Sequence, residues 1–183
     1  CELSPVAKKM ADAFWPGPLT MIFPKSARVP ENVSAGLSTV AIRFPAHPDA
    51  QRLIAAAETP IAAPSANRSG KPSPTTANHV FEDMDGRIPL ILDGGECLVG
   101  VESTVVDMTG SVPHILRPGG ITAEQIAQVA GASEVDSAVM RPLAEGEKPR
   151  SPGMAHRHYA PNGQLTVFTG DSDRVIQRIQ SEY

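Results

Sequence analysis

Short apolar runs alternate along this chain with segments of helical periodicity, and this alternation restricts the possible fold more than any other feature. Each run ends in glycine, proline or polar residues, as buried strands commonly do. The runs predicted as strands are Leu19–Phe23, Val40–Phe44, Ile61–Ala63, Leu90–Leu92, Ser103–Asp107 and His114–Leu116. The helical segments between them place the chain in the α/β class.

Capping residues mark where the expected helices begin. Serine precedes proline at Ser4 and Ser73, which combines an N-cap with the residue favoured at the first helical position. Thr122 and Gln125 have the spacing of a capping box, and Gly131 is suited to end that helix. The expected helices follow Ser4, span His47–Glu58, run from Ser73 to about Met84, and run from Thr122 to Gly131.

Periodicity divides the chain into three parts. Residues 1–131 hold the alternating strands and helices. Residues 132–164 have little periodicity and several prolines, which predicts a linker that is either a functional loop or an interdomain tether. Residues 165–183 contain one strand pattern, Leu165–Phe168, and one helix pattern. Because a strand and a helix cannot bury a core alone, this part is predicted to begin a second domain.

Composition excludes several classes of protein. The 16 Lys and Arg against 20 Asp and Glu give a net charge of −4, which excludes a strongly basic nucleic-acid module. No apolar stretch approaches the ~20 residues of a membrane-spanning helix. The two cysteines form neither a disulfide framework nor a zinc-ligand cluster, so we expect a reducing, cytoplasmic setting and no metal site.

A polar loop, Ser65–Ser73, separates a predicted strand from a predicted helix. It contains hydroxyl groups, the amide of Asn67, the cations Arg68 and Lys71, and Gly70. Small polar side chains and backbone N–H groups at a helix start suit a phosphate or another anion. The alternative is that Ser73 only caps a helix and that the loop is solvated.

Two arginines occupy positions that need a partner. Arg43 lies inside an apolar strand pattern and Arg117 at the end of another. A guanidinium can donate two hydrogen bonds to one carboxylate or phosphate. That acceptor can belong to the protein or to a ligand. Ser103 and Thr104 either line a pocket or, for the threonine, simply favour a strand. The basic segment Arg141–Pro161 either closes over an anionic ligand or is a solvated tether.

An ordered series of motifs resembles one family closely. The motifs are Phe14–Thr20, Thr39–Pro45, Ala63–Gly70, Gly100–Asp107, Leu116–Gly120, Ser151–Met154 and His158–Pro161. Their order resembles the Sua5/YrdC/TsaC family, specifically the longer, Sua5-type threonylcarbamoyl-AMP synthases. The resemblance implies a YrdC-like twisted open sheet with flanking helices and a concave ligand-binding face, then a linker and the start of a Rossmann-like Sua5 domain.

The resemblance also implies a reaction and its partners. L-Threonine, bicarbonate or CO2, and ATP would give L-threonylcarbamoyladenylate and pyrophosphate, with Mg2+ accompanying the nucleotide. Other tRNA-modification proteins would pass the threonylcarbamoyl group to adenosine 37 of tRNA. The large negative charge of the triphosphate implies catalysis by positioning and charge stabilisation, without a protein nucleophile.

Site residues follow from the resemblance position by position. Those implied for L-threonine are Arg43, Ala63 through its backbone, and Ser103 or Thr104. Those implied for ATP are Thr39, Ser65, Asn67, Ser73, Arg117 and Tyr159. The family's N-terminal Thr, Tyr and Lys-x-Arg elements do not occur before Phe14, so this chain is expected to be a fragment with weak or no synthase activity alone.

Two other functions stay open. A hollow α/β surface that carries Arg and Lys could bind tRNA or double-stranded RNA without catalysis, although the net charge of −4 argues against it. A carbamoyltransferase-type YrdC domain would use carbamoyl phosphate instead. The Ser151–Met154 and His158–Pro161 motifs favour the Sua5 type.

Overall fold

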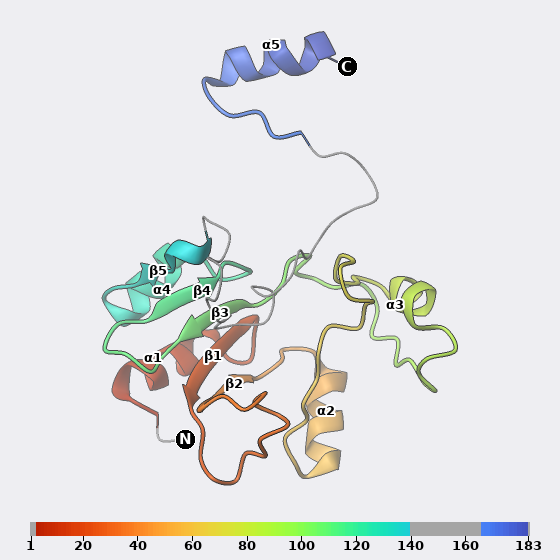
Figure 1. The fold of residues 1–183 in the computed structure, drawn as a ribbon, viewed down its shortest axis with the longest axis vertical. Coiled ribbons are helices and arrows are strands. Elements are labelled where there is room, and N and C mark those ends of the chain that lie inside the picture. Colours follow the sequence, from red (N-terminus) through yellow and green to blue (C-terminus); the bar gives the residue numbers. More distant parts are fainter. Residues whose placement is uncertain (1–2, 140–165, 183) are drawn as a thin grey trace.

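The computed structural model describes residues 3–139 and 166–182, and within them a mixed five-stranded sheet forms the centre of the molecule (Figure 1). The strand order is β2-β1-β3-β4-β5. β1 runs antiparallel to β2 and parallel to β3, and β4 runs antiparallel to β3 and parallel to β5. The strands are β1 (Leu19–Pro24), β2 (Thr39–Arg43), β3 (Thr104–Asp107), β4 (His114–Arg117) and β5 (Glu134–Val135).

Two helices cover one face of this sheet. α1 contributes Met10 and α4 contributes Ile126, and both are fully buried against Met21 of β1 and Val106 of β3. Burying each large apolar side chain contributes about 1.5–3 kcal/mol, so this layer holds the fold together. The helices are α1 (Pro5–Phe14), α2 (Pro48–Ala57), α3 (Ala77–Met84), α4 (Ala123–Ala130) and α5 (Ser172–Glu182), with a 3-10 turn at Ser137–Val139. The α/β class expected from the sequence is confirmed.

The predicted caps of α1 and α4 are confirmed. The Ser4 hydroxyl accepts a hydrogen bond from the Ala7 amide at 3.2 Å. At α4, the Thr122 hydroxyl accepts from the Gln125 amide at 3.3 Å, and the Gln125 side chain accepts from the Thr122 amide at 2.8 Å. Gly131 ends that helix at a φ of +87°, where a side chain would be strained.

Replacing Thr122 with Ala is expected to lower the free energy of unfolding by about 1 kcal/mol, because it leaves the Gln125 amide without its acceptor. Urea denaturation followed by circular dichroism measures the change. Thr122→Ser keeps the hydroxyl and serves as the matched control. If Thr122→Ala unfolds at the same urea concentration as Thr122→Ser, the capping box does not stabilise α4.

Two predicted strands are wrong. Residues 61–63 and 90–92 form no strand in the described part of the chain. Most of their side chains are exposed, with Leu90 at 70% and Leu92 at 66% of full accessibility, whereas Ile91 is half-buried. Both runs have the composition of strands, but no described strand lies beside them to complete a ladder. Composition alone therefore misplaced them.

The predicted start of α3 is also wrong. The helix begins at Ala77, with Thr76 as its N-cap: the Thr76 hydroxyl accepts from the His79 amide at 3.3 Å. The cause is tertiary, because the Cys97 amide donates to the Thr75 carbonyl at 2.9 Å. That carbonyl is bonded to another part of the chain, and the segment after Ser73 stays non-helical until Thr76.

The beginning of the predicted linker joins the sheet. Glu134 and Val135 form β5, which pairs with β4, so the sheet extends past residue 131. Two residues are too few to show a periodicity. Most of the remaining linker lies outside the described residues. Residues 166–168 form no strand, whereas the predicted helix beyond them is α5, which has no buried residue. Among the described helices, none combines the length and apolar character needed to cross a membrane.

Candidate functional site

A row of polar side chains crosses four strands on the sheet face that points away from α1 and α4. We call Arg43, Thr20, Ser103 and Arg117 the polar row. Arg43 of β2 lies directly opposite Thr20 of β1, and opposed residues share a face. The Thr20 and Ser103 hydroxyl oxygens lie 2.8 Å apart. Arg117 bonds to Ser103. Residues from distant parts of the sequence therefore meet across the sheet.

Strand alternation explains why Thr20 faces this way. Leu19, Met21 and Phe23 are buried beneath the helices, so the residues between them point to the opposite face. No role was predicted for Thr20 from the sequence. The available signal was a hydroxyl residue within an apolar run.

Arg117 reaches the polar row through an irregularity in the sheet. The register between β3 and β4 shifts at Val105 and Val106, so that Val105 pairs with Arg117 whereas Val106 pairs with Ile115. A bulge of this kind changes the direction of the side chains beside it. The Arg117 Nε and Nη2 atoms donate to the Ser103 carbonyl at 3.2 and 2.7 Å, and Nη2 donates to the Ser103 hydroxyl at 3.1 Å. The observed partner of Arg117 is thus Ser103, the residue just before β3, through its carbonyl and its hydroxyl.

Arg43 differs from Arg117 in its surroundings. It is exposed at the end of β2, and its guanidinium makes no hydrogen bond or ion pair with any residue that the structure describes. Its donors therefore have no described protein partner. A guanidinium in this state suits a carboxylate ligand, to which it can donate two parallel hydrogen bonds.

Ser103 and Thr104 lie on opposite faces of β3. The Thr104 side chain is fully buried, and its hydroxyl donates to the Ile121 carbonyl at 2.6 Å and accepts from the Ile121 amide at 2.9 Å. This side chain joins β3 to the start of α4 and does not line a pocket in this structure, which corrects its assignment. Of the two, only Ser103 belongs to the polar row.

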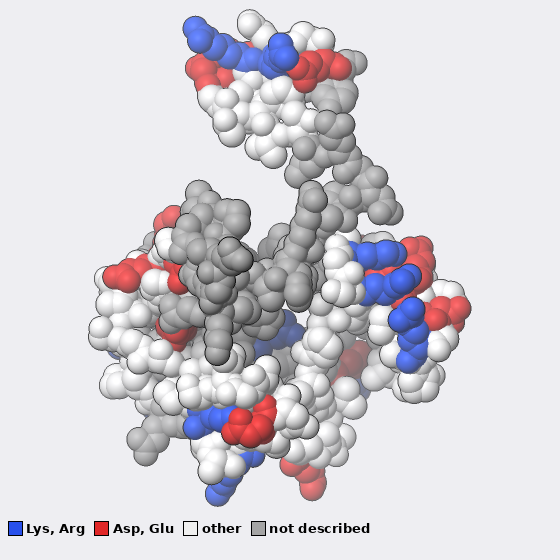
Figure 2. Space-filling view, viewed as in Figure 1, with Lys and Arg blue, Asp and Glu red and all other residues white. Residues whose placement is uncertain are grey.

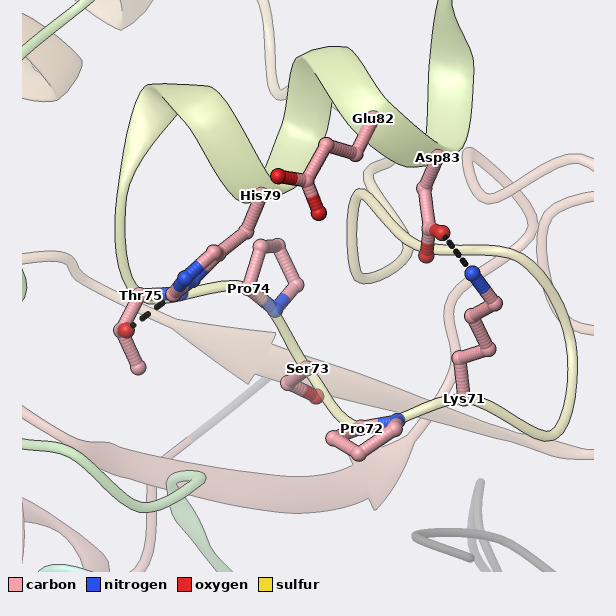
Figure 3. Close-up of a pocket in the computed structure, with 8 residues that line it drawn as sticks. All are labelled: Lys71, Pro72, Ser73, Pro74, Thr75, His79, Glu82 and Asp83. Carbon is pink, nitrogen blue, oxygen red and sulfur yellow. Dashed lines mark hydrogen bonds and ion pairs between the residues drawn. The ribbon is translucent and has the colours of Figure 1, made fainter. Parts of the chain in front are cut away.

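The polar loop before α3 is held by Asn67 and Asp83. The Asn67 Nδ2 atom donates to the Arg68 carbonyl at 3.1 Å and to the Lys71 carbonyl at 3.0 Å. Asp83, on α3, accepts from the Arg68 amide at 3.1 Å and pairs with the Lys71 ammonium at 2.7 Å, as Figure 3 shows for Lys71. The Asn67 Oδ1 atom is buried and has no hydrogen-bond partner in the described structure.

A pocket of about 260 Å³ lies between this loop and α3 (Figure 3). Its polar lining consists of Lys71, Ser73, Thr75, His79, Glu82 and Asp83. The hydrogen bond from the Lys71 ammonium lowers the pKa of the Asp83 carboxyl, and the Arg68 amide lowers it further. Asp83 is therefore ionised near neutral pH. Its stabilising effect is lost only when the pH falls through this lowered pKa.

The predicted site residues thus form two groups. Arg43, Ser103 and Arg117 share the polar row. Thr39 lies on the same face at the other end of β2, ~13 Å from Arg43 at the usual rise of a strand. The residues before α3 form the second group: Ala63 and Ser65 are exposed, Asn67 holds the loop, and Ser73 lines the pocket. No hydrogen bond between described residues joins the two groups, and Tyr159 lies outside those residues.

Comparison with known proteins identifies the kind of domain that this mixed sheet and its polar row form. A family model for Sua5, YciO and YrdC, described as "Telomere recombination", matches residues 1–119. A second, described as "Threonylcarbamoyl-AMP synthase, C-terminal domain", matches residues 121–183. The chain belongs to the Sua5/YciO/YrdC family.

Individual relatives agree with this membership. The chain is 50% identical over 98% of its length to the threonylcarbamoyl-AMP synthase of Pyrococcus abyssi, and 52% identical over 95% of its length to that of Bacillus subtilis. It covers 52% and 50% of those proteins, so it spans about half the length of these relatives. A crystal structure of P. abyssi Sua5 complexed with L-threonine matches with a TM-score of 0.91 and 48% identity, over all of this chain and 53% of that one.

Proposed function

We propose that this chain carries out, or forms part of the protein that carries out, the synthesis of L-threonylcarbamoyladenylate from L-threonine, bicarbonate or CO2, and ATP. The observation that carries the proposal is the exposed Arg43 guanidinium, which has no described protein partner in a fold that matches a threonine-bound relative at a TM-score of 0.91. A free amino acid presents the carboxylate that such a group binds.

The polar row supplies a way to hold threonine. Arg43 would bind the carboxylate through two hydrogen bonds, and Thr20 and Ser103 would lie beside the remainder of the amino acid. Arg117 stays a proposed ATP contact, as the resemblance implies, and it also fixes the Ser103 carbonyl and hydroxyl in place. Ala63 is kept as a proposed backbone contact.

The reaction consists of two bond-forming steps. The deprotonated threonine amine attacks the carbon of CO2 or bicarbonate to form N-carboxythreonine, with release of a proton when CO2 reacts and of water when bicarbonate reacts. A carboxylate oxygen of that product then attacks the α-phosphorus of ATP, and the bond to pyrophosphate breaks. The protein's proposed part is to align these groups and to stabilise the phosphate charge.

The second group of residues is the proposed nucleotide site. Ser65, Asn67 and Ser73 would contact ATP from the loop before α3, together with Thr39 and Tyr159. The described residues contain no group of three or more His, Cys, Asp or Glu that could hold a metal ion. We propose Mg2+ as the ion that accompanies the ATP phosphates, and assign it no step. Proteins that transfer the threonylcarbamoyl group to tRNA are the proposed partners.

RNA binding is the second candidate function. Figure 2 shows acidic side chains beside the basic ones over α3 and its adjoining loop, so the visible face there is not uniformly basic. Tight binding to phosphates along an RNA needs clustered positive charge. This distribution favours a small anionic ligand over RNA.

Calorimetry tests the proposed function. We expect L-threonine to bind this chain and to strengthen ATP binding roughly tenfold, within the usual range of coupling between two sites. The control titration replaces threonine with carbamoyl phosphate, and a second set titrates RNA at two salt concentrations. Coupling with carbamoyl phosphate instead of threonine would overturn the assignment, and so would steeply salt-dependent RNA binding with no threonine binding.

A further inference from the structure

Asp83 lies on α3, outside the polar loop, and its carboxylate makes contacts that fix this loop. Its carboxylate is buried, with 9% of the side chain exposed. One oxygen accepts from the Arg68 amide and the other from the Lys71 ammonium. Both ends of the turn formed by residues 68–71 are therefore attached to one side chain of the helix.

Asn67 binds the same two residues, Arg68 and Lys71, through their carbonyl groups. Its Nδ2 atom donates to the Arg68 and Lys71 carbonyls, and the Lys71 amide donates to the Arg68 carbonyl at 3.0 Å. Arg68 and Lys71 are thus each bonded both to Asn67 and to Asp83. If Asp83 released them, the groups that orient Asn67 would move.

The orientation of Asn67 matters because its Oδ1 atom is buried and lacks a partner in the described structure. An unpartnered buried acceptor costs about 1–3 kcal/mol, so proteins seldom retain one without a use. Asn67 is also a proposed nucleotide contact, so the orientation of its amide bears directly on ATP binding. The Nδ2 bonds settle which way the amide points, and those bonds depend on the turn that Asp83 fixes.

From this arrangement we infer that Asp83 is a positioning residue for the nucleotide site, which acts by holding residues 67–71 in the shape that binds ATP. The inference rests on the proposed function. Asp83 does not itself contact the reacting groups. Its carboxylate also compensates the Lys71 charge, so the loop keeps its shape before the phosphates arrive.

The test compares ATP affinity in Asp83→Asn and Asp83→Ala variants. Asp83→Asn keeps an oxygen for the Arg68 amide but loses the charge that pairs with Lys71, and Asp83→Ala loses both. We expect the ATP dissociation constant to rise roughly tenfold in Asp83→Ala and by less in Asp83→Asn, with threonine affinity unchanged. The matched control is Asp85→Asn, which removes the same charge from the exposed end of α3.

Two further readouts separate positioning from a loss of stability. Hydrogen exchange at the Arg68 and Lys71 amides should accelerate in Asp83→Ala while the amides of β1 and β3 stay protected. The double variant Asn67→Ala, Asp83→Ala should lose less ATP-binding free energy than the two single variants lose in total, because both residues act through the same turn. An equal loss of threonine affinity would indicate general destabilisation and overturn the inference.

The outcomes distinguish this inference from the proposed function. An unaltered chain that binds neither threonine nor ATP contradicts the proposed function, and the role of Asp83 falls with it. An unaltered chain that binds ATP, together with an Asp83→Ala variant of equal ATP affinity, leaves the proposed function intact and overturns only the role of Asp83.

Discussion

Replacing Gly119 with Ala is expected to lower the free energy of unfolding by about 3 kcal/mol and to displace the start of β3. A Cβ atom at this position would lie 2.3 Å from the Glu102 carbonyl oxygen and 2.6 Å from backbone atoms of Ser103 and Thr104. Backbone atoms cannot rotate away as a side-chain end can. The Gly120 amide also donates to the Glu102 carbonyl at 3.0 Å, so the two segments are held close together. Chemical denaturation measures the loss.

The effect of Gly119→Ala should extend to ligand binding because Ser103 belongs to the polar row. Moving Ser103 lengthens its bonds to Arg117 and its contact with Thr20. Gly110→Ala is the control, since a Cβ there meets nothing closer than the Val112 carbonyl oxygen at 3.8 Å. If the Gly119→Ala and Gly110→Ala variants have equal free energies of unfolding, the backbone before β3 can move aside for the added Cβ without loss of stability, and the prediction is wrong.

Short sequence patterns correctly predicted those helix caps and strands whose formation depends mainly on neighbouring residues. The capping box at Thr122 and Gln125 was predicted correctly because both its members lie within one turn of helix. In the capping box, the signal and the stabilising contact lie in the same short segment. The strand at Leu19 was predicted correctly because its run of apolar residues is buried, three of them on the helix-covered face.

The failures arise where a distant part of the chain decides the outcome. Pro74 follows Ser73, the predicted N-cap, yet α3 begins three residues after Pro74, because the Cys97 amide donates to the Thr75 carbonyl. Leu90 and its neighbours have the composition of a strand, but composition does not indicate whether another strand lies alongside. The irregular register that re-aims Arg117 has no signal in its own sequence.

The candidate site was only partly predictable for the same reason. The resemblance to a family supplied roles for Arg43 and Ser103, and the register then placed both on one face. The resemblance did not decide whether Ser103 or Thr104 faces the ligand, because the orientation of the strand decides which of two neighbouring side chains points towards the helices. Asp83 received no role, since a carboxylate on a short helix is normally solvated, and only the structure reveals its burial against Arg68 and Lys71.

Arg43 and Arg117 illustrate two uses of one side chain on one sheet face. Arg117 has an internal acceptor, so its removal leaves the Ser103 carbonyl without its charged donor. Arg43 has no acceptor among the described residues, so its removal leaves no described group unpaired. Arg117→Ala is accordingly expected to reduce stability and to weaken ligands through Ser103, whereas Arg43→Ala is expected to affect a ligand alone.

Replacing Arg43 with Ala is expected to raise the threonine dissociation constant about 100-fold, which corresponds to ~2.7 kcal/mol for a lost pair of charge-assisted hydrogen bonds. ATP affinity measured without threonine and the denaturation midpoint should stay unchanged, because the side chain is exposed. Calorimetric titration of each ligand alone measures these effects. Arg43→Lys should recover only part of the affinity, since an ammonium keeps the charge but lacks the planar fork.

The control for Arg43→Ala is Arg52→Ala, which removes another exposed arginine, this one from α2, where it pairs with Asp49. Threonine affinity in that variant should match the unaltered chain. If Arg43→Ala binds threonine as tightly as Arg52→Ala does, the Arg43 guanidinium does not hold the carboxylate. If threonine affinity and stability fall together, Arg43 has a structural partner, and its distinction from Arg117 disappears.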